Sequence, residues 1–331
     1  MGSAPIERIT CLYIGRIGDV IVATPFLRAL RKRFPKARIR LIAGYRAVQV
    51  LPLIPFIDEK LVLGRPGQVG AHLALASSLL TEKCDLLVDL NSSFSKTSTM
   101  LARAARPRLS LAFEKGKGPR VFNRVIPAPQ EREHMAHRYE RLTEAIGGTY
   151  GPDLELRVPP EDDAKAAQLL APLISADPGA FRVLIHPGNI TRPPAFWPAD
   201  RLTELARRLQ DDPTLKLFFL AGPGELETVR GISEKLPRAT ILPAASLPVV
   251  AGMVKRMNLL VGSLTSTTHM AAALGVPTFA FYEGYTQTVW RPRGARHGGT
   301  VSEQWSGVAS TTLEQAHAAL KEHLARLSPW I

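Results

Sequence analysis

An isolated carboxylate stands just after the first apolar run of the chain. The stretch YIGRIGDVIVATP places Gly15 and Gly18 behind a hydrophobic segment and Asp19 at the start of an apolar helical pattern. This spacing is neither that of a dinucleotide-binding fingerprint nor that of a P-loop. Asp19 could simply cap the helix. It could also serve as a general base, because a helix N-terminus favours the ionised form of a carboxylate.

A run of hydroxyl side chains follows the apolar segment 258–262. It includes Thr265, Ser266 and Thr267, and His269 comes within the same helical turn. Hydroxyls and backbone N–H groups at a helix N-terminus form a cradle for an anion, whereas capping alone requires one hydroxyl. We therefore predict a phosphate site here. His269 is either a donor to that phosphate or a histidine packed in the core.

Three further turns carry polar side chains, and each has two interpretations. Thr191 and Arg192 could contact an anion, or they could belong to a plain loop beside a packed tryptophan. Glu225 follows two glycines and could accept ribose hydroxyls, or it could only compensate the charge of a helix N-terminus. Lys96 lies in the hydroxyl-rich stretch 89–99, which could bind an acceptor or cap a helix.

The elements that must position these residues alternate between strand and helix along the chain, which predicts an α/β fold with parallel sheets. Strand patterns occur at 8–14, 38–43, 60–63, 85–90 and 109–112, and again at 181–186, 215–221, 239–242, 258–262 and 277–281. Helical patterns occur at 21–34, 67–81, 95–105, 134–147, 161–174, 198–210, 224–236, 247–256, 267–274 and 312–326.

Because the alternation occurs twice in 331 residues, we predict two Rossmann-like domains, 1–160 and 161–331. The last helix could pack back on the N-terminal domain or on its own. In open α/β sheets ligands bind beyond the carboxyl ends of the strands, where all five polar turns lie. No apolar run approaches the roughly 20 residues of a membrane-spanning helix.

Charge and cysteine content narrow the function classes. The net charge of +13 favours anionic partners, although a solvated basic face is equally compatible. Nothing beyond this charge supports nucleic-acid binding, because the basic stretches lack interleaved aromatic residues.

Cys11 and Cys84 lie in apolar runs, which predicts buried thiols and is consistent with a cytoplasmic protein. His134 and His137 share a helical face, but without a third ligand we expect no metal site.

Taken together, the motifs resemble those of the heptosyltransferase-like glycosyltransferases of family 9 over roughly residues 8–295. The segments that carry the resemblance are IGRIGDVIVATPFLRALRKRFP, IHPGN…FWPADRLTELARRL, LAGPGELE and LVGSLTSTTHMAAALGVPTFAFYEG. The resemblance implies the GT-B fold, with the active site in a cleft between two Rossmann-like domains. It also implies inverting transfer of heptose from ADP-heptose to the inner core of lipopolysaccharide, with no bound metal or other cofactor.

The resemblance also implies roles for individual residues. Asp19 matches the acid of the family's G-D-V motif and would be the general base. Thr191 and Arg192 would lie near the donor phosphates, and Glu225 would contact the ribose. The cradle under the diphosphate would consist of Thr265, Ser266, Thr267 and His269. Contacts to an anionic acceptor would come from Arg16, Lys96, Arg120 and Arg124 of the basic N-terminal half.

Two positions depart from the family pattern. Leu264 stands where the family's D-T-G-x-x-H loop has its acid, and Ser266 replaces the glycine. Ala195 stands where family members carry a lysine two residues before Trp-Pro, with Arg192 as a substitute cation. We expect an active enzyme with an altered donor site. The alternatives are a GT-B transferase with another donor or acceptor and a non-catalytic family member.

The same basic charge would hold the protein against the anionic inner leaflet of the membrane without a spanning helix. The predicted partners are therefore a nucleotide-sugar donor, an anionic lipopolysaccharide precursor and the inner membrane surface.

Overall fold

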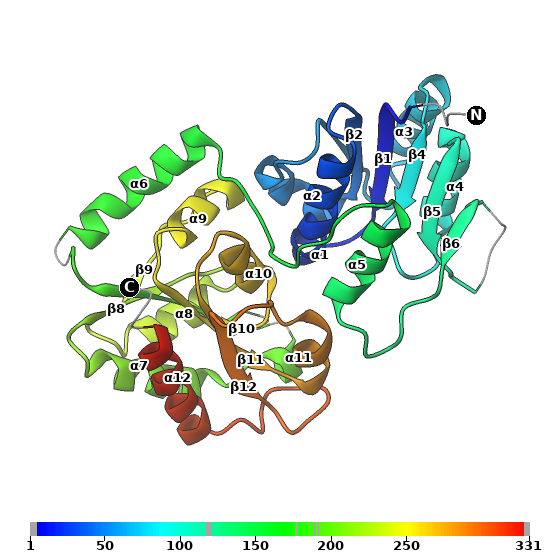
Figure 1. The fold of residues 1–331 in the computed structure, drawn as a ribbon. Helices are drawn as coiled ribbons and strands as arrows, with labels where there is room; N and C mark the ends of the chain where they lie inside the picture. Colours follow the sequence, from blue (N-terminus) through cyan, green and yellow to red (C-terminus); the bar gives the residue numbers. More distant parts are fainter. Residues whose placement is uncertain (1–4, 117–120, 176–177, 189, 191, 328–331) are drawn as a thin grey trace. The chain divides into compact units, whose positions relative to one another are not determined.

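The chain folds into two compact units, Met1–Pro152 and Asp153–Ile331, each built around a six-stranded parallel sheet (Figure 1). The computed structural model describes residues 5–116, 121–175, 178–188, 190 and 192–327. The boundary between the two units lies eight residues before the predicted boundary between residues 160 and 161.

The first unit has the strand order β3-β2-β1-β4-β5-β6, with every neighbouring pair parallel. Its strands are β1 (Arg8–Tyr13), β2 (Arg38–Gly44), β3 (Glu59–Leu63), β4 (Leu86–Asp89), β5 (Leu109–Phe113) and β6 (Arg124–Ile126). Its helices are α1 (Ile17–Val22), α2 (Thr24–Arg33), the 3-10 helix η1 (Tyr45–Leu53), α3 (Val69–Thr81), α4 (Lys96–Ala105) and α5 (Met135–Ala145).

The second unit repeats this topology with the order β12-β11-β10-β7-β8-β9. Its strands are β7 (Phe181–His186), β8 (Leu215–Phe219), β9 (Thr240–Ile241), β10 (Leu259–Ser263), β11 (Thr278–Tyr282) and β12 (His297–Val301). Its helices are α6 (Pro160–Ile174), the 3-10 helix η2 (Pro193–Ala195), α7 (Ala199–Gln210), α8 (Leu226–Ser233), α9 (Leu247–Val254), α10 (Ser266–Ala273), α11 (Gly284–Trp290) and α12 (Leu313–Leu327).

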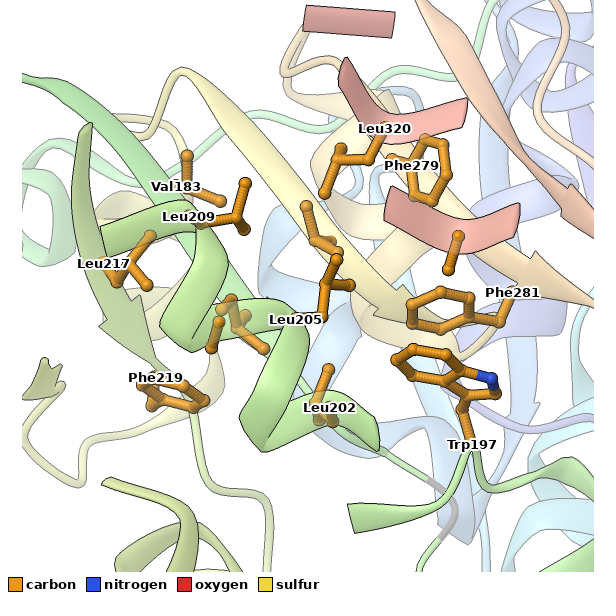
Figure 2. Packing of buried hydrophobic residues seen from close by; sticks show 14 of the residues in the cluster. Val183, Trp197, Leu202, Leu205, Leu209, Leu217, Phe219, Phe279, Phe281 and Leu320 are labelled. Atoms are coloured by element: carbon orange, nitrogen blue, oxygen red, sulfur yellow. The ribbon is translucent and has the colours of Figure 1, made fainter. Parts of the chain in front are cut away.

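A buried tryptophan holds the segment before α7 in the core of the second unit. Trp197 is fully buried and stacks on Phe281 with ring centroids 4.2 Å apart (Figure 2). Its indole N–H donates to the carbonyl of Thr311 over 3.0 Å. Leucines of α7 and α12 pack into the same cluster. The contacts of α12 are with β12 and α7, so the last helix packs on its own unit.

Most predicted elements are present, and the differences have local causes. The predicted helix 21–34 is two helices that meet at Ala23. Pro25 has no N–H to donate to the carbonyl of Ile21, and the Thr24 hydroxyl donates to that carbonyl over 2.7 Å. The edge strands β6 and β12 were not predicted, because β6 is short and β12 contains two glycines. Cys11 and Cys84 are buried free thiols, as predicted.

Two histidines of the second unit make its stability sensitive to acid. Burial lowers the pKa of His323 to about 4, and the guanidinium groups of Arg326 and Arg291 act in the same direction. Burial likewise lowers the pKa of His297 to about 4. Below pH 6.5 the unfolded chain therefore binds protons that the folded chain does not. The free energy of unfolding should fall as the pH drops from 6.5 towards 4, by up to about 1.4 kcal/mol per pH unit for each histidine.

Urea unfolding monitored between pH 7.5 and 4.5 checks this expectation. The variant His323→Leu should show a shallower pH dependence, and His137→Gln, which changes an exposed histidine of the first unit, should not. An unchanged slope in His323→Leu would contradict the assignment.

Candidate functional site

Both units place polar side chains at the same point of their topology. The strand order reverses between β1 and β4 in the first unit and between β7 and β10 in the second. At such a reversal the connections leave the neighbouring strands on opposite faces of the sheet, and ligands of open α/β folds bind at the carboxyl ends of these strands. Asp19 follows β1, whereas His186 ends β7 and Thr265 follows β10. Asp19 in the first unit, and His186 and Thr265 in the second, therefore lie at the carboxyl ends of their sheets.

Asp19 occupies the third position of α1, and its side chain folds back over the turn that precedes the helix. Its Oδ2 accepts a hydrogen bond from the backbone N–H of Arg16 over 2.6 Å. A Cβ on residue 15 would lie 2.8 Å from the Cβ of Asp19, so this turn requires a glycine. The capping role and the site role that the sequence left open are thus both compatible with the structure.

Burial raises the pKa of Asp19, and the hydrogen bond and charge of Arg16 offset this only in part. The helix N-terminus favours the ionised form, as expected from the sequence, but burial of the side chain outweighs it. A carboxylate with a raised pKa is a stronger base than an ordinary aspartate.

A buried polar network holds the turn in front of Asp19. The Asn91 Oδ1 accepts from the N–H of Ile14 over 3.0 Å, and the Asn91 amide donates to Oδ1 of Asp89 over 2.6 Å. Asp89 is fully buried and forms an ion pair with the buried Lys115. The end of β4 thereby fixes the end of β1, and through it the start of α1.

Asp19 lines a cavity of about 460 Å³ at the carboxyl end of the first sheet. Cationic and aromatic side chains share its wall. Arg46 donates to the Tyr45 hydroxyl over 3.0 Å, and the guanidinium carbon of Arg65 lies 6.0 Å from the centroid of the Tyr45 ring. The cavity is lined by Ile14, Gly15, Arg16, Asp19, Gly44, Tyr45, Arg46, Leu63, Gly64, Pro66, His72 and Thr97.

Sequence reasoning missed Tyr45, Arg46 and His72 as members of this cavity. A usable signal existed, because GYR directly follows the strand pattern 38–43 and strand ends carry ligands in this fold class. His72 lies within the predicted helix 67–81, where the pattern does not mark it as a residue of a site. Its Nε2 lies 3.0 Å from the carbonyl oxygen of Gly64, which ties the start of α3 to the cavity wall.

The predicted acceptor residues differ in position. Arg16 is exposed and lines the Asp19 cavity, whereas Lys96 is exposed at the start of α4 next to the lining residue Thr97. Ser95 caps α4, which agrees with the capping interpretation of 89–99. Arg120 lies outside the described residues. Arg124 begins β6 and lines a separate cavity of about 600 Å³ at the amino ends of the strands.

In the second unit, one histidine joins two of the predicted donor residues. The Nε2 of His186 lies 3.1 Å from Oε2 of Glu225, and its Nδ1 lies 3.3 Å from the Thr265 hydroxyl. Burial alone would raise the pKa of Glu225. Its hydrogen bonds with His186 and with the N–H of Gly222 lower that pKa overall. Sequence reasoning placed His186 only at a strand end and gave it no role.

The start of α10 uses some of its hydroxyls for its own cap. The Thr265 hydroxyl accepts from the N–H of Thr267 over 3.2 Å, and the Thr268 hydroxyl donates to the Ser263 carbonyl over 3.1 Å. Capping therefore engages two hydroxyls rather than the single one assumed from the sequence. Ser266 is half-buried, and His269 is buried with its ring 6.3 Å from that of Trp290.

The loop after β7 carries Arg192 and Ala195, and Leu264 directly follows β10 at the same end of the sheet. Thr191 lies outside the described residues, and Arg192 is exposed. Gly188 has φ +59°, and a Cβ there would lie 2.6 Å from the Thr265 side chain, so the loop passes directly over the start of α10. Ala195 and Leu264 are half-buried and uncharged.

Two general properties follow from the described part of the chain. Within those ranges, no group of three or more histidine, cysteine or acidic side chains is arranged to hold a metal ion. No described helix combines the length and apolarity needed to cross a membrane.

Residues 72–317 match the sequence model of glycosyltransferase family 9 (heptosyltransferase). Lipopolysaccharide heptosyltransferase 3 of Escherichia coli K12 is 22% identical over 292 residues, which are 83% of this chain and 82% of that relative.

Solved structures share the fold at low sequence identity. The family 9 glycosyltransferase from Veillonella parvula has a TM-score of 0.85 at 21% identity, with 97% of this chain and 98% of that chain covered. The E. coli heptosyltransferase WaaC with ADP-2-deoxy-2-fluoro heptose has a TM-score of 0.73 at 18% identity, with 97% and 99% covered.

Proposed function

The chain belongs to glycosyltransferase family 9, the heptosyltransferase family, and from this premise we propose that it moves a heptose from ADP-heptose to an inner-core lipopolysaccharide acceptor. It is a glycosyltransferase with the GT-B fold. The observation that carries the finer proposal is the cavity of the first unit, where the half-buried Asp19 lies among cationic and aromatic side chains. The transfer inverts the anomeric centre and uses no metal ion.

In this proposal Asp19 is the general base. It takes the proton from the acceptor hydroxyl as that oxygen attacks the anomeric carbon, and the nucleoside diphosphate departs from the opposite side. The raised pKa of Asp19 supports this role, because a base is most effective when its pKa approaches the working pH. Arg16, Arg46 and Lys96 provide positive charge for the phosphates and acidic sugars of the acceptor, and Arg120 is a further proposed contact.

The nucleotide sugar binds at the carboxyl end of the second sheet. Glu225 accepts the ribose hydroxyls, and its low pKa keeps it ionised for that task. The diphosphate rests on the start of α10, where Thr265, Ser266, Thr267 and His269 join the positive end of the helix dipole. Thr191 and Arg192 act on the same phosphates. His186 positions Glu225 and Thr265 relative to each other through its two ring nitrogens.

The departures at Ala195 and Leu264 define how this donor site differs from the family pattern. Loss of the lysine removes a cation that would stabilise the leaving diphosphate, and loss of the acid removes a like charge beside it. The two changes offset each other electrostatically in part. Arg192 supplies a cation in the same loop. We propose that the enzyme is active and that its preference among sugar nucleotides is altered.

Two other functions remain as alternatives with distinct signatures. A GT-B transferase acting on a different donor or acceptor would bind another nucleotide more tightly than ADP. A non-catalytic member would bind a nucleotide sugar and release no nucleotide diphosphate in the presence of acceptor. Nucleotide release measured with ADP-heptose and a delipidated inner-core acceptor tests the proposed function directly, and the absence of release with intact donor binding would favour the non-catalytic alternative.

The proposed ribose contact gives a specific binding prediction. Glu225→Gln keeps an acceptor for the N–H of Gly222 but removes the negative charge. Affinity for ADP should fall about 10- to 100-fold, because a hydrogen bond to a charged group contributes about 1.5–3 kcal/mol. Glu227→Gln is the matched control, because Glu227 is an exposed acid in the first turn of α8, the helix that Glu225 precedes.

Isothermal titration of both variants with ADP, UDP and GDP provides the measurement. Equal affinity of Glu225→Gln and the parent for every nucleotide would contradict the ribose assignment. Tighter binding of UDP or GDP than of ADP by the parent would favour the different-donor alternative.

We further propose that the protein works in the cytoplasm at the inner membrane surface, where its acceptor is made.

A further inference from the structure

One helix of the first unit exposes an unusual amount of apolar surface. Helix α3 carries no charged side chain over its 13 residues, VGAHLALASSLLT. Val69 is 63% exposed, Leu73 is 64% exposed and Leu80 is 50% exposed. These residues are four and seven positions apart and therefore share one face of the helix. We call this surface the α3 face.

The α3 face is not needed for packing within the unit. Leu75 and Leu79 point the opposite way and contribute to the core against β1, β2 and β4. A surface helix usually carries polar residues opposite its buried stripe. In α3 both sides are apolar, so the outer side is suited to a second apolar environment.

The neighbouring helix α4 exposes a further apolar side chain and adds positive charge. The two helices contact each other beside the first sheet (Figure 1). The outer side of α4 presents Met100, which is 67% exposed, between the exposed Lys96 and Arg103. These three residues follow the helical spacing of one face. An apolar strip bordered by cations matches the interface of a bilayer that contains anionic lipids.

The α3 face is also continuous with the Asp19 cavity. His72, next to Leu73 in α3, lines that cavity together with Gly64 and Pro66. Arg65 is exposed between those two residues, and its guanidinium lies over the Tyr45 ring at the cavity wall. A surface that contacts lipid here would bring the cavity next to the lipid headgroups.

We propose that the α3 face, with Met100, inserts into the interface of an anionic bilayer and lies in the membrane plane. A helix of 13 residues is about 20 Å long, too short to span the hydrocarbon core. A second copy of the chain fits this surface less well, because it would bring the same cationic borders together in a protein of net charge +13. The inference rests on the proposed function for the identity of the lipid-linked acceptor but not for the insertion itself.

An environment-sensitive fluorophore tests insertion directly. Leu73→Cys can be labelled with a nitrobenzoxadiazole probe, because the native Cys11 and Cys84 are buried. With phosphatidylethanolamine/phosphatidylglycerol vesicles, the probe emission should shift to the blue and become quenchable by spin-labelled lipids. Leu226→Cys, on α8 of the second unit with 43% exposure in the parent, is the matched control and should give neither change.

Vesicle flotation measures how much the exposed apolar side chains of the α3 face contribute to membrane binding. The double variant Val69→Ser, Leu73→Ser removes only exposed apolar groups, so the fold should be retained. Its partitioning onto anionic vesicles should fall about tenfold or more, because burial of each side chain is lost. Leu226→Ser should partition like the parent.

Several outcomes would overturn the inference. One is an unchanged probe signal with anionic vesicles. Another is a blue shift that appears without vesicles and grows with protein concentration, which would assign the α3 face to self-association. Nucleotide release with a detergent-dispersed acceptor separates the two proposals: release without insertion rejects only this inference, whereas insertion without release rejects only the proposed function.

Discussion

Replacing Asp19 by asparagine is expected to lower kcat by about 10²- to 10⁴-fold while the affinity for the nucleotide sugar is retained. Asparagine fills nearly the same volume and still accepts the hydrogen bond from the N–H of Arg16, but it cannot take up a proton. The donor would be bound by residues of the second unit, which this substitution does not touch. The effect should therefore appear in the chemical step.

The same substitution should not lower the stability of the protein. Because burial raises the pKa of Asp19, the ionised carboxylate is disfavoured in the folded state relative to the unfolded chain. Removing that charge should leave the free energy of unfolding unchanged or slightly increased. A loss of rate without a loss of stability separates a catalytic role from a capping role, for which the substitution would affect stability first.

The pH dependence provides an independent check on the base. The acid limb of kcat/KM for the parent should lie above the usual range of an aspartate, because the pKa of Asp19 is raised. Activity should be lost as the pH falls and Asp19 becomes protonated. Asp200→Asn, which changes an exposed acid in the first turn of α7, should keep both the rate and the pH profile of the parent. A kcat within a few-fold of the parent in Asp19→Asn would reject Asp19 as the base.

The sequence predicted those features of the fold that depend on local patterns. The turn at Gly15 and Asp19 and the hydroxyls around Thr265 follow apolar runs directly, and strands buried on both faces read as such runs. The short strand β6 and the glycine-containing β12 pair through backbone groups at the sheet edge. Their side chains therefore carry little pattern from which a strand could be predicted.

The parts of the site that were missed depend on contacts between distant segments. His186 reads as the end of a strand until the fold brings Glu225 and Thr265, 39 and 79 residues away, to its two nitrogens. The pKa of Asp19 depends on burial, which no motif records. Arg65 and Tyr45 lie 20 positions apart and meet only because β2 and β3 are neighbours in the sheet.

The ion pair between Asp89 and Lys115 leads to the largest expected effect on stability. Asp89 is fully buried, and the Lys115 side chain is 7% exposed. Lys115→Met keeps the length and most of the apolar stem but leaves a buried carboxylate without its cation. The free energy of unfolding of the first unit should decrease by about 3–5 kcal/mol. Lys83→Met, at an exposed position, should change it by less than about 0.5 kcal/mol.

A double variant distinguishes loss of the ion pair from a general packing defect. Asp89→Asn keeps an acceptor for the N–H and amide of Asn91 and removes the buried charge that Lys115→Met leaves behind. Combining the two should therefore recover a large part of the stability lost in Lys115→Met, with a coupling energy of about 1–3 kcal/mol in urea unfolding. Additive losses would instead indicate independent packing effects.

Lys115→Met should lower kcat as well. Asn91 accepts from the N–H of Ile14, so a shift of Asp89 and Asn91 would displace the turn that holds Asp19.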